Sequence, residues 1–100
     1  MDQRKLDQIF NKFAGREVPL VEREYEIGAD RKKIKLLELL NPNDPVISEM
    51  RQTANERNLR LRVWWPGVSS TLDYRYDRVN TYIVKDDDGK WRVSQKFTIG

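Results

Sequence analysis

The chain has 100 residues, of which 38% are apolar and 35% charged, and its formal net charge is +3. This length provides one domain, and the apolar content is too high for a disordered chain. Cysteine and histidine are both absent, which excludes disulfides, thiolate and imidazole metal sites, and Ser–His–Asp catalysis. An active site made of carboxylates remains possible, but no pattern in the sequence supports one. We therefore expect no enzyme, no cofactor and no metal site.

The charge pattern and the first residues bear on partners and location. Basic and acidic residues are interleaved, which is typical of an ordinary solvated surface. The N-terminus has no apolar segment of the signal-peptide kind, and no uncharged run is long enough to span a bilayer. We expect no membrane association and a cytoplasmic location for the chain as given. A chain already trimmed of a signal would be secreted or periplasmic.

The first 44 residues are predicted to form a helix followed by a strand. Residues 2–14 place apolar side chains at the spacing of one helix face, and Gly15 follows as a C-terminal stop. Residues 21–27 alternate glutamates with mostly apolar side chains, which predicts a strand with one acidic, solvated face. Residues 28–30 form a turn or a helix N-cap. Residues 31–40 are ambiguous, because their composition favours a helix while the preceding strand needs a hairpin partner.

The remaining residues are predicted to form one helix and three strands. Asp44 caps a helix that begins at Pro45 and ends at 56–58. Apolar alternation predicts strands over 59–65, 79–85 and 91–97. The chain thus predicts an α+β fold in a single domain, residues 1–100. It comprises a small mixed β-sheet packed on one main helix, a long loop, and an N-terminal extension of helix and strand over residues 1–44.

A loop of about a dozen residues, from Pro66 to Asp77, joins the first two of these strands. Loops of that length inside a small domain are usually functional or disordered. This one contains Thr71, Leu72 and Tyr74, which a solvated linker does not need. The loop is therefore the candidate functional segment.

The loop sequence resembles that of a known family. The run from Thr71 to Val79, Thr-Leu-Asp-Tyr-Arg-Tyr-Asp-Arg-Val, resembles the reactive-site segment of the potato inhibitor I family of serine protease inhibitors. With Trp65-Pro66-Gly67 and Asn80 it is closer still to the related bacterial peptidase-inhibitor family, and Thr98-Ile99-Gly100 matches how these inhibitors end. The resemblance covers residues 45–100 as a potato inhibitor I-like core. It implies a serine protease of the chymotrypsin or subtilisin kind as the partner.

The resemblance also implies roles for loop residues by position. Leu72 would fill the primary specificity pocket of the protease, and Leu72–Asp73 would be the scissile bond. The protease-binding loop would comprise Ser70, Thr71, Leu72, Asp73 and Tyr74.

Three further residues are implied as support for this loop. Arg78 would lie beneath the loop and brace it, aided by Arg75 and Asn80. Plant and leech members carry a second arginine where this chain has Asn80. An exposed ion pair between Asp73 and Arg78 contributes little alone, so we expect a network in which Arg75, Asn80 and Thr71 donate hydrogen bonds to loop carbonyls.

Other interpretations stay open beside inhibition. A protein-interaction domain with the inhibitor-like frame and no inhibitory activity is the alternative, favoured by residues 1–44 and the absent export signal. Trp64 between arginines suggests a stacking platform for single-stranded nucleic acid. We expect instead that Phe10 and Phe13 of the N-terminal helix cover Trp64, that Trp65 lies in the core, and that nucleic acid is not the partner. Neither the target protease nor the oligomeric state follows from the sequence.

The acidic run Asp86-Asp87-Asp88-Gly89 has the composition of a calcium loop but not its ligand spacing. Lysines flank it on both sides. We expect a hairpin turn there.

Overall fold

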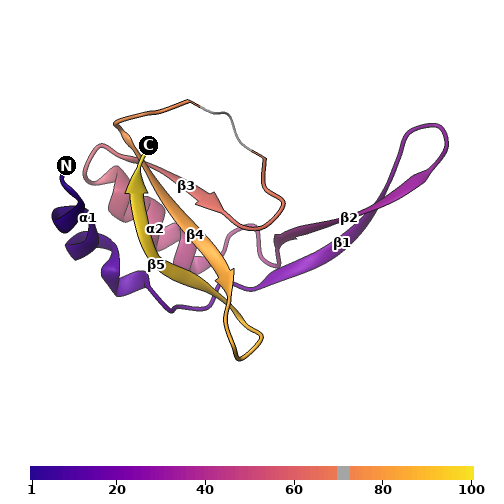
Figure 1. Cartoon of the computed structure of the whole chain (residues 1–100), viewed down its shortest axis with the longest axis horizontal. Coiled ribbons are helices and arrows are strands. Elements are labelled where there is room, and N and C mark those ends of the chain that lie inside the picture. Colours follow the sequence, from indigo (N-terminus) through magenta and orange to yellow (C-terminus); the bar gives the residue numbers. More distant parts are fainter. Residues whose placement is uncertain (70–72) are drawn as a thin grey trace.

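The computed structural model describes residues 1–69 and 73–100, which form a mixed α+β fold (Figure 1). The predicted fold class is confirmed. In chain order the elements are helix α1 (Gln3–Phe10), a 3-10 turn η1 (Asn11–Phe13), strands β1 (Leu20–Ile27) and β2 (Lys32–Leu39), helix α2 (Pro45–Asn55), and strands β3 (Arg60–Trp64), β4 (Arg78–Lys85) and β5 (Trp91–Ile99).

The central sheet has three strands in the order β3-β4-β5. β3 and β4 are parallel, with Arg62 in register with Asn80, whereas β4 and β5 are antiparallel. A parallel pair needs a connection that returns along the strand, and the described parts of that connection, residues 65–69 and 73–77, contain no helix. This topology is what places the long loop above the end of the sheet where β4 begins (Figure 1).

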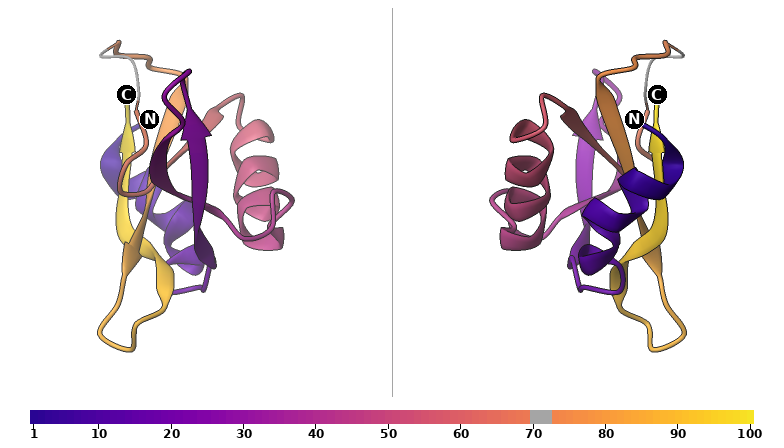
Figure 2. Two further views of the ribbon diagram at one scale, coloured as in Figure 1. Left: turned by 90° about the vertical axis from the view of Figure 1, so that its right-hand side faces the viewer. Right: turned by 90° about the vertical axis from the view of Figure 1, so that its left-hand side faces the viewer.

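Both helices contribute to one hydrophobic core. α2 begins at Pro45, and the Asp44 carboxylate accepts hydrogen bonds from the amides of Val46 and Ile47 as an N-cap. Figure 2 shows this helix lying against one face of the sheet. The fully buried members come from both helices and from the sheet: Leu6, Phe10, Phe13, Met50, Ala54, Val79, Ile83, Val93 and Phe97.

The first 44 residues do not form a separate layer. Phe10 stacks on Phe97 of β5 with 5.6 Å between ring centroids. The segment after α1 continues along β5, where the amide of Gly15 donates to the carbonyl of Val93 and the amide of Val18 to that of Trp91. The N-terminal segment therefore covers the edge of the sheet that β5 would otherwise expose.

Residues 32–39 form strand β2. Of the two structures left open for residues 31–40, the helix is therefore wrong and the hairpin strand is confirmed. β2 pairs with β1 as an antiparallel hairpin from Leu20↔Leu39 to Ile27↔Lys32. The lysines of β2 face the glutamates of β1, with Lys33–Glu24 and Lys35–Glu22 at 3.6 Å. Cross-strand pairs of opposite charge favour this hairpin over an isolated helix. The hairpin projects away from the body of the molecule (Figure 1).

Trp64 is not covered by the N-terminal helix, and this expectation is wrong. Phe10 and Phe13 are buried in the core. Trp64 lies on the opposite, outer face of the sheet, nearly parallel to the Tyr82 ring at 6.5 Å. The alternation along β3 gives the reason, because Leu61 and Val63 take the inward positions. Trp65 packs against the core only in part, and its indole N–H donates to the carbonyl of Leu37.

The acidic run at residues 86–89 forms the expected turn between β4 and β5. The amide of Gly89 donates to the carbonyl of Asp86, and Gly89 has a φ of 78°, a left-handed conformation that glycine adopts without strain. No cluster of acidic residues in the described part of the chain is arranged to hold a metal ion. Within residues 1–69 and 73–100, no helix has the length and apolar character needed to cross a membrane.

Candidate functional site: the base of the 65–77 loop

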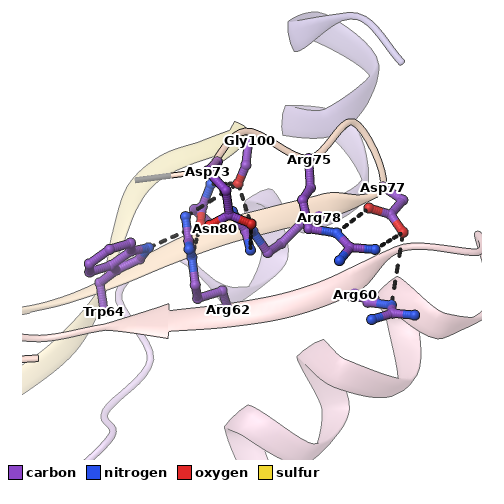
Figure 3. A network of polar contacts seen from close by, with 9 residues as sticks. All are labelled: Arg60, Arg62, Trp64, Asp73, Arg75, Asp77, Arg78, Asn80 and Gly100. Carbon is purple, nitrogen blue, oxygen red and sulfur yellow. Dashed lines mark hydrogen bonds and ion pairs between the residues drawn. The ribbon is translucent and has the colours of Figure 1, made fainter. Parts of the chain in front are cut away.

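The candidate site lies where the long loop returns to the sheet, at the start of β4. Figure 3 shows the polar side chains that meet there, from β3, β4 and the loop. Of the residues expected to bind a protease, Asp73 and Tyr74 are described, whereas Ser70, Thr71 and Leu72 lie outside the described residues. The scissile bond Leu72–Asp73 is therefore represented only by its second residue.

Arg78 joins the loop to the end of the sheet. Its Nη2 donates to the carbonyl oxygen of Asp73 at 2.8 Å, and its Nε donates to the carbonyl oxygen of Gly100 at 2.8 Å. A carboxylate oxygen of Asp73 lies 3.6 Å from Nη1 of the same guanidinium. The Arg78 side chain is only 11% exposed, whereas the Asp73 side chain is half exposed, so the contact with Gly100 is better shielded from water than the contact with Asp73. One planar donor group thus connects two chain segments, a geometry that arginine provides and lysine does not.

Asn80 is buried, and its side-chain amide makes three hydrogen bonds. Its Oδ1 accepts from Nε of Arg62 at 2.8 Å and from the indole N–H of Trp64 at 3.0 Å, while its Nδ2 donates to the carbonyl of Gly100 at 3.0 Å. Because the amide oxygen accepts from two donors and the amide nitrogen donates to a carbonyl, the orientation of the amide is fixed. Asn80 therefore positions Gly100 and the β3 side chains. Among the described residues it makes no hydrogen bond to a loop carbonyl, contrary to our expectation.

Arg75 and Asp77 form a bidentate pair at the point where the loop ends. Nε and Nη2 of Arg75 donate to the two carboxylate oxygens of Asp77 at 3.1 and 3.2 Å. The Arg75 hydrogen bond lowers the pKa of Asp77 below its ordinary value. Arg60 lies 3.8 Å from the same carboxylate, and its amide donates to the Asp77 carbonyl. Arg75 thus closes the local turn instead of donating to a carbonyl of the described part of the loop.

The tyrosines of the loop are exposed on its surface. Tyr74 is 74% exposed and Tyr76 83% exposed. A methyl group built on Gly100 would lie 3.6 Å from the Tyr74 ring, so this ring lies close to the anchored end of β5. Neither tyrosine is buried, and both are available to a partner.

Five members of this network were not among the residues predicted from the sequence: Arg60, Arg62, Trp64, Asp77 and Gly100. Nε of Arg62 donates to Oδ1 of Asn80, and its Nη2 lies 3.3 Å from the Gly100 carbonyl oxygen. Its ring contact with Trp64, at 4.5 Å from guanidinium carbon to centroid, holds it in place. The strand register that sets Arg62 opposite Asn80 is a tertiary property.

Comparisons of the chain with protein-family models, with curated proteins and with solved structures find no match.

Proposed function

We propose that the chain is a serine protease inhibitor of the potato inhibitor I type. It presents a substrate-like loop, with Leu72–Asp73 as the scissile bond, to chymotrypsin- or subtilisin-like proteases. The observation that carries the proposal is the Arg78 guanidinium, which bonds to the Asp73 carbonyl directly after that bond.

A protease binds its substrate as an added strand, through main-chain hydrogen bonds and side-chain pockets. A loop that is already held extended loses little conformational entropy when it docks. In this chain the residues after the scissile bond are held on the sheet by Arg78 and by the Arg75–Asp77 pair. These contacts replace the disulfides that a cysteine-free chain cannot form.

The same brace supplies a reason for slow turnover. Cleavage of Leu72–Asp73 would leave a new amine on Asp73, while Leu72 would stay bound to the protease as an acyl group. Because Arg78 holds the Asp73 carbonyl at 2.8 Å, the amine would remain close to the acyl group. Religation of the peptide bond then competes with hydrolysis, as expected for a reaction between groups kept in position.

Arg62 supports the proposal from the neighbouring strand. The resembled plant and leech inhibitors have two supporting arginines on one strand, and here the second position is Asn80. Arg62 reaches the same place from β3 and bonds both to Asn80 and to the Gly100 carbonyl. The chain therefore has two guanidinium groups at the loop base, as the proposed mechanism requires.

The test uses the full chain against subtilisin and chymotrypsin. We expect the chain at micromolar concentration to slow hydrolysis of a chromogenic peptide, and Leu72→Gly to abolish this effect. Leu40→Gly is the matched control, because Leu40 is 55% exposed and lies outside the loop, and it should inhibit like the parent. Mass spectrometry should find the only slow cleavage at Leu72–Asp73.

Two results would contradict the proposal. Rapid cleavage at Leu72–Asp73 without inhibition would indicate a non-inhibitory interaction domain with an inhibitor-like frame. Equal inhibition by the parent and by Leu72→Gly would show that the protease is blocked through another surface.

A further inference from the structure

The outer edge of β3 is open to strand addition. β3 is an edge strand whose ladder runs only to β4. Within residues 1–69 and 73–100, the amides of Leu61 and Val63 have no backbone partner on the outer side. The other edge of this sheet, along β5, is covered by residues 15–18. The β3 edge is thus a row of backbone donors and acceptors that another strand can satisfy.

An apolar groove of about 300 Å³ runs beside this edge. Leu39 of β2, Ile47 of α2, and Leu61 and Val63 of β3 are among its walls. Arg51 of α2 and Arg62 of β3 also line it, and Arg51 makes no ion pair among the described residues. An added strand would therefore place apolar side chains in the groove on its inner side. On its outer side it would meet the arginines of β3.

The β1–β2 hairpin has the matching pattern. One face of the hairpin carries exposed apolar side chains, Tyr25 and Ile27 of β1 at 40% and 48% and Leu36 of β2 at 43%, together with Arg23 and Glu38, which form an ion pair with each other. The alternate positions of β1 are Glu22, Glu24 and Glu26. Most of this hairpin contacts no other element, and a two-stranded hairpin alone is marginally stable in water. The outer edge of β1 has no strand partner among the described residues.

Charge decides which strand fits the β3 edge. Two β3 edges paired with each other would set arginines against arginines, and two β1 edges would set glutamates against glutamates. β1 against β3 sets Glu24 and its neighbours beside Arg60 and Arg62, with the apolar residues of both strands on the other face. Opposite charges across strands are favourable, and like charges are not.

We propose that the β1 edge of one copy of this chain adds to the β3 edge of a second copy. The contact buries the apolar face of the hairpin in the groove between β3 and α2 of the second copy. It accounts at once for an exposed apolar hairpin and for an open strand edge. The interface does not depend on the protease-binding loop, so it stands or falls separately from the inhibitor function.

Sedimentation velocity over a range of concentrations tests the contact by charge exchange. The parent should self-associate, and Glu24→Lys and Arg60→Glu should each weaken association about five- to tenfold. An equimolar mixture of these two variants should recover association, because lysine on one chain then faces glutamate on the other. Glu56→Lys, which reverses an exposed charge at the end of α2, is the control and should associate like the parent.

Thiol cross-linking gives a second measurement that does not need a charge reversal. The chain has no cysteine, so Glu24→Cys in one chain and Arg60→Cys in another introduce unique thiols. The contact predicts disulfides between the two different variants in preference to either variant with itself. A parent that stays monomeric to millimolar concentration, or cross-links that join only hairpin to hairpin, would overturn the proposal.

Discussion

Replacing Arg78 by methionine removes the brace while keeping much of the buried aliphatic volume. Two hydrogen bonds from a charged donor are lost, to the carbonyls of Asp73 and Gly100, both at 2.8 Å. Bonds of this kind contribute roughly 1.5–3 kcal/mol each when shielded from water. Two features reduce that sum. Gly100 keeps the Asn80 donor, and the Asp73 side chain is half exposed, so water can approach this end of the brace. We expect Arg78→Met to lower the free energy of unfolding by about 2 kcal/mol.

The measurement is urea unfolding followed by tryptophan fluorescence. For a domain of this size, a loss of about 2 kcal/mol moves the midpoint by roughly 1–2 M urea. Arg78→Lys keeps the charge but not the fork, so it can retain only one of the two bonds and should lose about half as much. The same variants should be cut faster by subtilisin, because the segment after Leu72 is no longer held.

Arg57→Met is the matched control for this experiment. Arg57 also donates to a carbonyl, that of Thr53 at 3.2 Å, but from an exposed position at the end of α2. Its removal should change the unfolding midpoint little, as for most surface substitutions. If Arg78→Met unfolds at the same urea concentration as Arg57→Met, the guanidinium does not brace the loop. The reasoning from its hydrogen bonds would then be refuted.

Three further outcomes are expected. Leu72→Arg should transfer inhibition from chymotrypsin to trypsin, whose specificity pocket carries an aspartate. A variant that inhibits neither protease, or that still prefers chymotrypsin, would argue against Leu72 as the specificity residue. Asp77 should titrate below about 3.9, the usual pKa of an aspartate, because Arg75 lowers its pKa. The stability that the Asp77 carboxylate contributes is therefore present above pH 3.9 and lost as pH falls through the lowered pKa. A pH titration followed by carbon NMR of the Asp77 carboxyl should measure the lowered pKa. Arg75→Gln should return this pKa toward its ordinary value. Phe10→Ala should lower the free energy of unfolding by about 3–5 kcal/mol, because Phe10 is fully buried against Phe97. A melting temperature, measured by calorimetry, that hardly changes would show that the N-terminal helix lies outside the cooperative core.

Local patterns in the sequence were sufficient for most of the elements. Asp44 before Pro45 marks the start of α2, because the cap depends only on residues within one turn. The strands of the sheet follow from alternation along each one. Residues 31–40 show where such reasoning fails. Their composition suits a helix, and only the glutamates of β1, which they face across the hairpin, decide for a strand.

The candidate site was predictable in its members on β4 but not in its connections. The loop sequence identified Arg78 and Asn80, and the structure shows what each contacts. The bonds of Asn80 could not be predicted, because its partners Arg62 and Gly100 are 18 and 20 residues away. The expectation that Phe10 and Phe13 cover Trp64 was wrong for a related reason. Alternation places Trp64 on the outer face of β3, but which face of the sheet the N-terminal helix covers is a property of packing.

Arg62 and Asn80 are best understood as one unit. An arginine at position 80 would set two guanidinium groups against each other at the register pair that β3 and β4 share, where like charges are unfavourable. With asparagine there, the amide oxygen accepts from Arg62 and Trp64, and the amide nitrogen bonds to the Gly100 carbonyl. The second guanidinium is that of Arg62 on the neighbouring strand β3, and the Trp64 ring fixes its orientation. A loop without disulfides is thereby tied to all three strands of the sheet, because Arg62 belongs to β3, Arg78 and Asn80 to β4, and Gly100 directly follows β5. Loss of either partner of the Arg62–Asn80 pair should therefore loosen Gly100 and, through Arg78, the segment at Asp73.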